Sequence, residues 1–573
     1  MLRWVNAAMA LAAVAALGVL IAEYGFDLGP GVVESLHAAE AAAAYLFCAL
    51  QLSKLFLVAR PLQLLRRSGF EFALLFLLGF QLLAAAGLEG APEHAYLSRH
   101  GNPAPLAAAT VLFVQGYVLA VAGLRSTWLQ DALFRLRLHP AQTLLASFVV
   151  LIAGGTALLC LPNASAEGRS IGLLDALFTA ASAACVTGLS TVDIGSRFST
   201  LGQCVILALI QIGGLGILTL TAAAALVGGR GLGSQAREVG RLLEVETVPQ
   251  IRRLLMKVLG LTFGIEALGA ALLYAPMVSR LDDPFVGGFY AIFHSVSAFC
   301  NAGFGLFPDS LAPFRGHSAA MATFSALIVA GGLGAPVLER LPRAVLSALR
   351  GRWREIPRHA RVVLGASLLL TLGGGACFWL LERGGRLAGS TPEEAFWGSL
   401  FLSITARTAG FDVGRTAALG GPSVALLVAL MFVGGSPAST AGGVKTTSLA
   451  VAWAWLRSRL SGRAPRLAGR PLQAGEEGRV RWVLAGMGGL ALGSLLLLAL
   501  FEGRADGGLL FEAVSALGTV GLSLDVTPTL SAGGKLVIIL TMLFGRVGPA
   551  CLVLTWALRH PDVKTGADPI SVG

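Results

Sequence analysis

The sequence predicts an all-α protein that crosses a membrane many times, and three observations support this. Its 573 residues are 55% hydrophobic and only 13% charged, whereas soluble domains carry about 25% charged residues. Apolar stretches of about 20 residues, the length that spans a bilayer, recur from one end of the chain to the other. Four short segments of similar sequence, each ending at a glycine, stand between the later stretches. This composition argues against a soluble enzyme, a disordered tail or an ordinary nucleic-acid-binding protein.

Twelve candidate spans are placed along the chain by their apolar length. We expect the first to be a retained helix and not a signal peptide, because it has one early basic residue, Arg3, and eleven further spans follow it. The predicted spans are residues 5–23, 38–59, 70–88, 104–124, 141–161, 201–228, 255–279, 317–337, 361–381, 420–455, 481–501 and 534–558.

The distribution of basic residues predicts the orientation of these spans. Residues 340–361 contain seven arginines against one acid, Glu355, and residues 457–481 contain seven more against Glu476 and Glu477. Cytoplasmic loops are rich in Lys and Arg, and an even number of spans leaves both termini in the cytoplasm. The net charge of +11 is therefore explained by topology, and no nucleic-acid partner is predicted.

The sequence carries no catalytic or cofactor-binding pattern. The seven cysteines are widely spaced and form no C-x-x-C pair, which argues against a disulfide framework and against a zinc site. Neither H-E-x-x-H nor the phosphate-binding pattern G-x-x-x-x-G-K-[ST] occurs. We therefore predict a protein that is not an enzyme and that has no cofactor of its own.

The four short segments lead to Gly188, Gly303, Gly410 and Gly521, which are 115, 107 and 111 residues apart. Three copies have a Phe ten residues before the glycine and Ser-Ala six and five residues before it, and the third copy is one residue shorter. Each segment has about a dozen apolar residues, too few to cross a bilayer, so we expect re-entrant helices. Backbone that is not helical is tolerated at membrane depth only where it is buried or lines a water-filled cavity.

Four such loops can converge on one axis, which predicts a pore. Glycine permits the backbone angles that turn successive carbonyls toward an axis, and rings of carbonyl oxygens can replace the hydration shell of a cation. The negative C-terminal ends of the short helices would also favour a cation. The alternative is that these glycines only allow close helix packing, and four matched copies at matched spacing argue against it.

The repeat divides the chain into five parts. The predicted fold class is an all-α polytopic membrane protein with four membrane–pore–membrane repeats around one pseudo-four-fold pore, plus about four N-terminal transmembrane helices. No predicted span of the N-terminal part has an arginine ladder, which argues against a voltage sensor. The predicted parts are the N-terminal helices at 1–139 and pore repeats at 140–229, 230–339, 340–456 and 457–573.

The span at 420–455 is interrupted by flexible and polar residues. The first ten residues of the segment 434–447 include four glycines and Pro437, and such a segment cannot sustain a straight helix. A kink or a cytoplasmic turn would also explain it, but apolar sequence on both sides favours a loop at membrane depth. We expect this loop to gate the pore through Gly435, Ser436, Pro437, Ser439, Thr440, Gly442 and Gly443.

Two basic residues are further candidates for the gate. Arg546 lies inside the last predicted span, where an arginine costs several kcal/mol and by default indicates function; a structural ion pair or snorkelling is the alternative. Lys445 ends the interrupted segment and is either a gating residue or an ordinary anchor at the membrane boundary.

At these residues the sequence resembles the Trk/Ktr/HKT superfamily of potassium transporters, and the bacterial Trk and Ktr membrane subunits (TrkH/KtrB-like) in particular. Segments 185–190, 293–304 and 406–411 resemble the filter signatures of that family, and the resemblance covers roughly residues 140–558. It implies potassium uptake driven by the membrane potential. The filter ligands that it implies are Val186, Thr187, Gly188, Asn301, Ala302, Gly303, Thr408, Ala409, Gly410, Thr519, Val520 and Gly521.

The resemblance also bears on selectivity and on the gate. Plant members that prefer sodium are associated with serine at the first filter position, where this chain has Gly188. The segment 434–447 resembles the intramembrane gating loop of the family, except that Ala438 stands where glycine is common. Arg546 resembles the pore-facing arginine beneath the filter, whose charge would oppose cation passage until the gate moves.

The resemblance further implies a multi-pass protein of the cell inner (plasma) membrane that forms a homodimer. Its arginine-rich cytoplasmic loops would dock a separate ring of nucleotide-binding regulatory subunits (TrkA/KtrA-like), and K+ would be the only metal ion, as the transported ion. A sodium-permeable channel and a potassium symporter coupled to H+ or Na+ remain open alternatives. The lack of a catalytic centre argues against an intramembrane enzyme, and four copies argue against a two-fold alternating-access carrier.

Overall fold

The computed structural model describes residues 140–216, 248–352, 355–414, 416–472 and 475–559, with scattered positions between 18 and 49. Contacts divide the chain into two units, the first made of Met1–Leu138 and Thr221–Arg252 and the second of His139–Leu220 and Arg253–Gly573. The four N-terminal spans predicted before residue 139 and the repeat boundary predicted at 229–230 lie outside the described residues, apart from those scattered positions. The second unit contains all four glycine-bearing segments and the interrupted segment 434–447.

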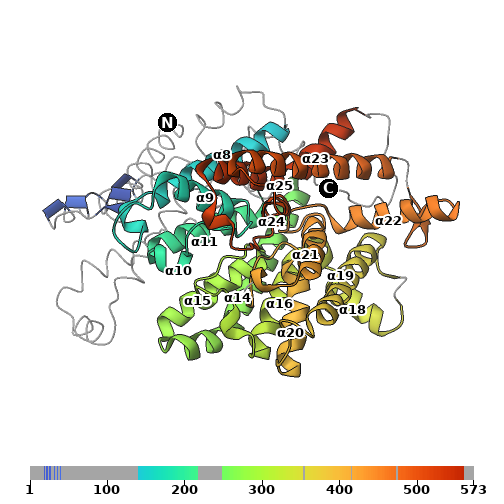
Figure 1. The fold of residues 1–573 in the computed structure, drawn as a ribbon, viewed down its shortest axis with the longest axis horizontal. Coiled ribbons are helices and arrows are strands. Elements are labelled where there is room, and N and C mark those ends of the chain that lie inside the picture. The colour runs from blue at the N-terminus through green and yellow to red at the C-terminus, as the bar shows by residue number, and fades with distance from the viewer. Residues whose placement is uncertain are drawn as a thin grey trace. The chain divides into compact units, whose positions relative to one another are not determined.

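The second unit is built of long and short helices in alternation (Figure 1). The order is α8 (Pro140–Leu159), α9 (Leu173–Ala184), α10 (Ile194–Arg197), α11 (Thr200–Leu215), α14 (Val248–Leu281), α15 (Pro284–Phe299), α16 (Ser318–Leu333), α17 (Ala335–Leu338), α18 (Leu341–Leu349), α19 (Arg358–Glu382), α20 (Pro392–Thr405), α21 (Gly421–Phe432), α22 (Thr446–Ser461), α23 (Glu476–Glu502), α24 (Gly507–Gly518) and α25 (Ala532–Arg559). A small antiparallel pair, β1 (Arg466–Leu467) and β2 (Arg470–Pro471), follows α22, with Arg466 opposite Pro471.

Four helices in the described part of the chain are long and apolar enough to cross a membrane. They are Met256–Leu281, Arg358–Glu382, Glu476–Glu502 and Ala532–Val553, and they coincide with the spans predicted at 255–279, 361–381, 481–501 and 534–558. The other predicted spans in this part correspond to shorter apolar helices. Hydropathy therefore located the long helices correctly.

Glycine determines where two of the shorter helices end. α11 ends at Leu215, where Gly216 adopts a φ of 75°, and α16 ends at Leu333, where Gly334 adopts a φ of 81°. A positive φ at this position is favourable for glycine and stops helical hydrogen bonding. The prediction of one helix over 317–337 is therefore wrong beyond Leu333, because the chain turns there before α17 begins.

Three of the four short helices, α15, α20 and α24, begin with a side-chain cap, whereas α9 follows Gly172 without one. Asp283 caps α15 by accepting hydrogen bonds from two backbone N–H groups, and Asp506 caps α24. Thr391 and Glu394 form a capping box at the start of α20. The backbone N–H of Thr391 donates to Glu394 and holds the pKa of that carboxyl below its ordinary value. Each helix ends a few residues before one of the four glycines.

The phenylalanine that marks each sequence copy anchors the core. Phe178, Phe293, Phe401 and Phe511 each have 0% of their surface exposed. In a bilayer, helices associate through close van der Waals packing, so each short helix is held by its own large apolar contact. The recurrence of Phe ten or nine residues before the glycine therefore reflects packing.

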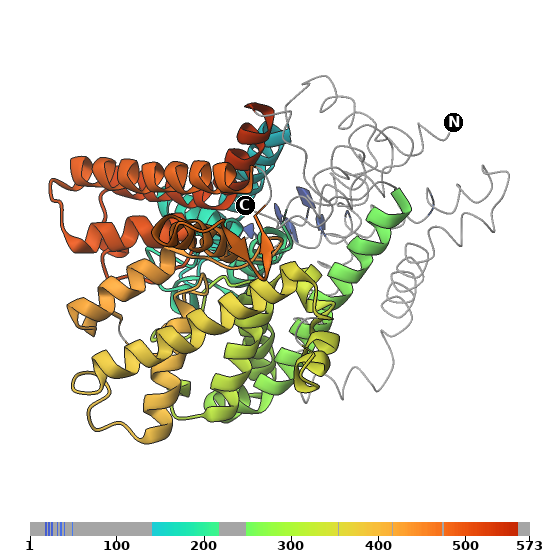
Figure 2. The ribbon, with the colours of Figure 1, turned by 90° about the vertical axis from the view of Figure 1, so that its right-hand side faces the viewer.

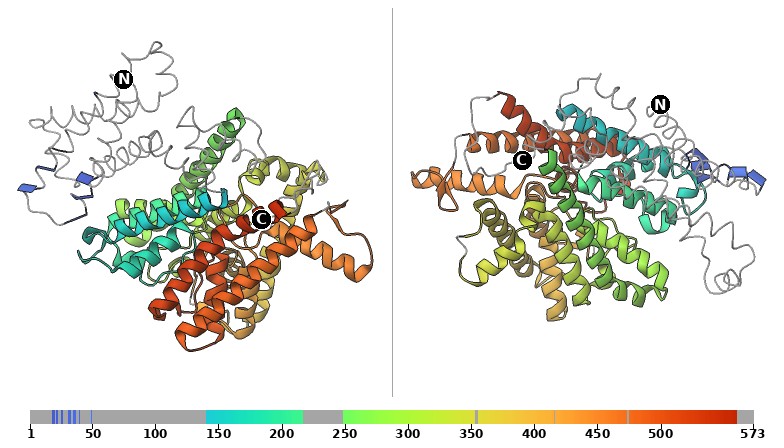
Figure 3. Two further views of the ribbon diagram at one scale, coloured as in Figure 1. Left: turned by 90° about the horizontal axis from the view of Figure 1, so that it is seen from above. Right: turned by 180° about the vertical axis from the view of Figure 1, so that it is seen from behind.

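The longer helices enclose the short ones. α23 packs lengthwise against α25 (Figure 2), α8 packs on α9, and α19 packs on α20. α24 contacts both α21 and α25. Figure 3 shows α22 extending away from the other helices in two views of the unit.

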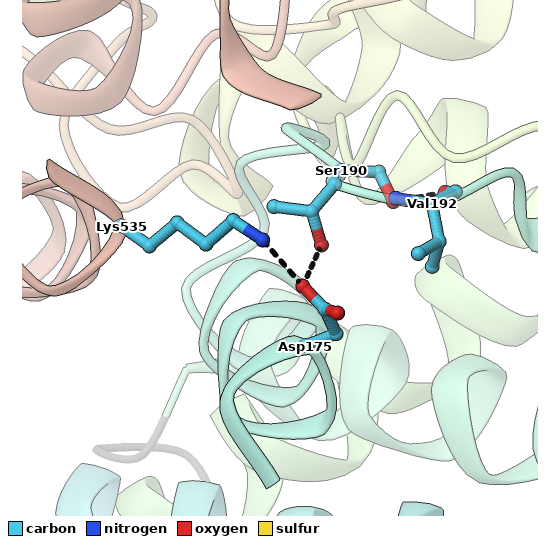
Figure 4. A network of polar contacts seen from close by, with 5 residues as sticks. Asp175, Ser190, Val192 and Lys535 are labelled. Carbon is cyan, nitrogen blue, oxygen red and sulfur yellow. Dashed lines mark hydrogen bonds and ion pairs between the residues drawn. The ribbon is translucent and has the colours of Figure 1, made fainter. Parts of the chain in front are cut away.

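An ion pair joins the beginning of the unit to its end (Figure 4). Asp175 in the first turn of α9 accepts hydrogen bonds from Lys535 Nζ in α25 and from Thr191 Oγ1, both at 2.8 Å. The side chains of Asp175 and Lys535 are only 29% and 16% exposed. This contact spans 360 residues of sequence and links α9 to the last helix.

We expect the Asp175–Lys535 pair to stabilise the unit. Asp175→Asn and Lys535→Gln should show a coupling free energy of about 1–3 kcal/mol in a double-mutant cycle, since partly buried charged hydrogen bonds have this strength. Thermal unfolding of the purified protein in nanodiscs measures it. The exposed pair Arg352–Glu355, at 3.7 Å, is the control and should couple by less than about 0.5 kcal/mol. Equal coupling in the two pairs would contradict the prediction.

Candidate ion pathway

The four glycines of the sequence repeat meet in a closed ring. A methyl group built on Gly188 would lie 2.4 Å from the carbonyl oxygen of Ala302, and one built on Gly303 would lie 2.6 Å from that of Ala409. A methyl group built on Gly410 would lie 2.3 Å from Val520 O, and one built on Gly521 would lie 2.2 Å from Thr187 O. Each glycine therefore faces the residue that precedes the next glycine, and the fourth faces the first. The structure brings together all four predicted filter segments.

Positive backbone angles recur through the four segments. The glycines have φ of 92°, 70°, 75° and 95°, and the residues two positions earlier also have positive φ. A left-handed angle costs a residue with a side chain roughly 1–2 kcal/mol, so the surrounding contacts must hold these turns in place. The earlier residues are Val186 at 58°, Asn301 at 59°, Thr408 at 72° and Thr519 at 49°.

A hydroxyl group from each short helix forms a hydrogen bond with the backbone of the glycine segment that follows that helix. Ser182 Oγ accepts from Gly188 N at 3.1 Å, and Ser297 Oγ donates to Phe304 O at 2.8 Å. Thr405 Oγ1 donates to Phe411 O at 2.7 Å, and Ser515 Oγ both accepts from Gly521 N and donates to Leu522 O. Sequence reasoning recorded the serine in three copies only as part of the pattern and missed this role, although its constant distance from the glycine was the available signal.

We expect Ser515→Ala to weaken ion discrimination. The substitution leaves Gly521 N and Leu522 O without their hydroxyl partner, at a cost of about 1–3 kcal/mol, and frees the loop to move. The blocking concentration of Na+ divided by that of K+, measured on rubidium uptake, should fall at least three-fold. Ser399→Ala is the matched control, because its hydroxyl bonds only to carbonyls of its own helix, Ala395 O and Phe396 O. An unchanged ratio in Ser515→Ala would show that this bracing is unnecessary.

The other predicted filter residues also lie in these loops and are buried. Ala302, Ala409 and Val520 supply the carbonyls that face the neighbouring glycines. The hydroxyls of Thr187, Thr408 and Thr519 are buried and have no hydrogen-bond partner among the described residues. The Asn301 side-chain amide faces Ile328 O and Ala298 O, to which its NH2 group donates once the amide oxygen and nitrogen are exchanged.

The interrupted segment forms a loop between α21 and α22. Gly434 N donates to Val444 O at 2.8 Å, and Thr446 N donates to Gly435 O at 3.0 Å, so the two ends of the loop pair with each other. Ser436 Oγ lies 3.3 Å from Thr446 Oγ1, and Ser439 Oγ donates to Ser436 O. The predicted break at 434–447 is therefore present, between Phe432 and Thr446.

This loop packs against α16 and against the fourth filter segment. Ser436 N donates to Gly332 O, and Thr440 N donates to Gly331 O. A methyl on Gly334 would lie 2.7 Å from Pro437 O, and one on Gly442 would lie 2.2 Å from Thr519 Oγ1. Gly443 has a positive φ of 66°. The loop thus contacts α16 and Gly334 through Ser436, Pro437 and Thr440, and it contacts the fourth filter segment through Gly442.

Ala438 sits in the loop with a φ of 55°. This is the left-handed region, which glycine enters freely and alanine enters at a cost of roughly 1–2 kcal/mol. The departure from glycine noted in the sequence therefore stores strain in the loop.

Arg546 ties the loop to α11. Its Nη1 donates to Thr440 O in the loop, and its Nη2 donates to Gly213 O at 2.6 Å. Lys445 Nζ donates to Ala441 O at 2.7 Å, within the loop itself. The two basic residues predicted from the sequence therefore both bind carbonyls of the loop.

Arg546 belongs to a glycine-rich pattern that occurs four times in the chain and that sequence reasoning overlooked. The chain reads Gly-Gly-Leu-Gly at 213–216 and 331–334, Gly-Gly-Ser-Pro at 434–437 and Gly-Arg-Val-Gly at 545–548. A methyl on Gly213, Gly331 or Gly545 would lie within 2.3 Å of a carbonyl at the end of a short helix. In this alignment Arg546 takes the position of the second glycine of the pair.

Two buried charged residues lie behind the loops. Arg407, directly before Thr408, donates to Ser367 O, Ser367 Oγ and Thr371 Oγ1 of α19, each at 3.2 Å. Glu266 of α14 accepts from Gln211 Nε2 at 3.2 Å, and Cys300 Sγ lies 3.7 Å from it. Sequence reasoning passed over both, although an ionisable residue inside an apolar stretch was a usable signal.

Comparisons with known proteins agree with these features. Residues 110–565 match the TrkH family, described as a cation transport protein. The potassium/sodium uptake protein NtpJ of Enterococcus hirae is 35% identical over 432 residues, which cover 74% of this chain and 94% of that protein. The Ktr system potassium uptake protein B of Vibrio alginolyticus is 34% identical over 444 residues, 75% of this chain and 94% of that protein.

A solved structure shares the fold. The potassium transporter TrkH from Vibrio parahaemolyticus matches with a TM-score of 0.56 and 20% identity, over 84% of this chain and 96% of that one. The helical fold, the apolar helices and the family match together identify a membrane protein, and the chain belongs to the TrkH family of cation transport proteins.

Proposed function

We propose that the protein takes up potassium through one pore around which four membrane–pore–membrane repeats are arranged with pseudo-four-fold symmetry. The observation that carries the proposal is the closed ring of glycine loops, in which each glycine faces a carbonyl of the next segment. Backbone oxygens arranged in rings can replace the hydration shell of K+. The proposed ligands are the oxygens of residues 186–188, 301–303, 408–410 and 519–521.

The name of the Vibrio alginolyticus relative supports potassium as the transported ion, because it is called a potassium uptake protein. Uptake would be driven by the membrane potential, in the plasma membrane and with both termini in the cytoplasm. The arginine-rich segments 340–361 and 457–481 support this orientation.

The loop 434–447 is the proposed gate. The proposal is supported by its contacts with Thr519 and Gly332 and by its tether to Arg546. Deleting residues 436–442 should raise resting cation flux, and a deletion variant with unchanged flux would refute this role.

Regulation is proposed to come from a separate cytoplasmic ring of nucleotide-binding subunits that docks on a homodimer of this chain. The proposal is supported by likeness to Ktr system proteins and by the arginine-rich segments that would face the cytoplasm. Flux through a purified complex should change when ATP, ADP or NAD is added. The same flux with and without each nucleotide would refute it.

Rubidium uptake tests the central proposal. Purified protein in proteoliposomes should accumulate tracer rubidium, and external K+ should block the uptake at concentrations at which Na+ does not. Empty liposomes give the background uptake. Uptake that K+ fails to block would refute a potassium pore.

Sodium permeation is the second candidate, and one comparison favours it. NtpJ is named a potassium/sodium uptake protein, so the same ring could pass both ions. Equal competition by K+ and Na+ in the rubidium experiment would support this alternative. A potassium symporter would instead show uptake that depends on a gradient of H+ or Na+.

A further inference from the structure

A groove between α22 and α23 lies outside the proposed ion path. It has a volume of about 250 Å3 and is lined mainly by apolar side chains. Trp453, Trp455 and Leu456 line it from α22, and Val480, Arg481 and Leu484 line it from α23. An apolar groove with cations at one end is suited to a ligand that has a hydrocarbon part and a negatively charged part.

Two guanidinium groups lie over one indole ring beside this groove. Arg459 Cζ is 5.6 Å and Arg481 Cζ is 5.9 Å from the centre of the Trp455 ring. The two arginines come from different helices, and each lies within cation–π distance of the same ring. Glu477 is 3.8 Å from Arg481, whose side chain is 58% exposed, and such a pair is weak. The two positive charges of Arg459 and Arg481 are therefore only partly balanced by the one nearby carboxylate, Glu477.

The outward side of α22 carries a stripe of apolar side chains. Trp453, Leu456 and Leu460 are 64%, 42% and 81% exposed, and their spacing of three and four residues places them on one helix face. Figures 1 and 3 show that α22 extends away from the remaining helices. Exposed leucine and tryptophan in this pattern, with arginines beside them, are typical of a helix at the boundary of a bilayer.

We propose that this groove binds an anionic glycerophospholipid of the cytoplasmic leaflet. The phosphate lies between Arg459 and Arg481, because the planar guanidinium donates paired hydrogen bonds that match phosphate oxygens. One acyl chain follows the apolar lining between α22 and α23. The inference rests on the membrane placement of α23 and on the cytoplasmic orientation of its first turns, and not on the ion that the pore selects.

The apolar stripe favours a lipid over a protein as the occupant. We expect a soluble regulatory subunit to dock on the charged segment nearby, whereas the exposed Trp453 and Leu460, with arginines beside them, suit the boundary of a bilayer. The site is also close to the proposed gate along the chain. Lys445 precedes the first residue of α22, and Thr446 N donates to Gly435 O in the loop. A lipid bound to α22 would therefore restrain the helix on which the loop ends.

Photolabelling in nanodiscs tests the proposal. The full-length protein is placed in phosphatidylcholine containing a trace of phosphatidylglycerol that bears a diazirine on one acyl chain, and labelled peptides are mapped by mass spectrometry. We expect label within residues 449–456 and 480–484. Labelling there should fall at least five-fold in the double variant R459Q/R481Q. Unlabelled phosphatidylglycerol, but not phosphatidylcholine, should compete with the probe on the unmodified protein, which tests the site even if the variant misfolds.

A matched control separates a site from general surface charge. R457Q/R463Q removes two arginines of the same segment that are not over the Trp455 ring, and it should keep the label. Equal loss in the two double variants, or equal labelling by phosphatidylcholine and phosphatidylglycerol probes, would overturn the proposal. Loss of groove labelling on forming the homodimer or on adding the cytoplasmic partner, with bulk lipid labelling retained, would show that protein and not lipid covers the groove. None of these readouts depends on flux, so failure here is distinct from failure of the proposed transport.

Discussion

Replacing Gly410 by alanine is expected to abolish uptake. Its φ of 75° and the Val520 carbonyl 2.3 Å from the position of the new methyl both oppose the change. A contact that short cannot persist, so either segment 408–410 or segment 519–521 must move. The carbonyl oxygens replace the hydration shell of the cation, so moving them away removes its ligands. Rubidium uptake into proteoliposomes should fall at least a hundred-fold.

Gly389 provides the control for this substitution. It has a φ of 78°, close to that of Gly410, but no atom lies within 4 Å of the position that a methyl would take. Gly389→Ala therefore carries the same backbone cost, roughly 1–2 kcal/mol, without the clash. We expect it to lower the unfolding temperature slightly and to leave uptake within two-fold of the unmodified protein. If Gly410→Ala transported as well as Gly389→Ala, the ring would not be the ion path.

Replacing Arg546 by alanine is expected to open the pathway at rest. The guanidinium donates to Thr440 O in the loop and to Gly213 O in α11, and charged hydrogen bonds contribute about 1.5–3 kcal/mol each. Losing even one such bond from the closed state shifts the population of open molecules about ten-fold. Removal of the charge also lowers the barrier to a cation. Resting rubidium uptake should rise at least ten-fold without a regulatory partner.

Two further variants distinguish the effect of the Arg546 hydrogen bonds from the effect of its positive charge. Arg546→Lys keeps the positive charge but has one ammonium group, which cannot reach both carbonyls as the guanidinium does. A resting flux close to that of Arg546→Ala would assign closure to the hydrogen bonds, and a flux close to that of the unmodified protein would assign it to the charge. Arg504→Ala, an exposed arginine whose partner is Asp506 at 3.5 Å, should leave flux unchanged. If Arg546→Ala did not alter flux, Arg546 would have no part in the pathway.

The residues that recur at fixed spacing in the sequence were sufficient to predict the four glycine loops and the interrupted helix. The four glycines, the phenylalanines ahead of them and the flexible segment 434–447 are all visible in the sequence, because each requires a particular residue type at a local position. A short apolar helix needs its buried Phe, and a left-handed turn needs its Gly. These requirements act within a dozen residues, so one chain read by itself reveals them.

Contacts between distant segments were not predictable in this way. Arg546 and Thr440 are 106 residues apart, and Arg546 and Gly213 are 333 residues apart. The sequence marks Arg546 as unusual because a charge at membrane depth is costly, but not which carbonyls accept from it. The same holds for Arg407 and Glu266, whose partners lie on helices that pack together only in the folded chain.

The sequence by itself determined that this is a helical membrane protein with four related glycine loops and one broken helix, because hydropathy, helix length and backbone freedom are properties of short segments. Only the tertiary structure decided that the loops close into a ring in which each glycine faces its neighbour's carbonyl, that Ser515 and its counterparts brace them, and that Arg546 joins the broken segment to α11. These features depend on distances of a few ångströms between residues far apart in the chain, which packing sets and local pattern does not.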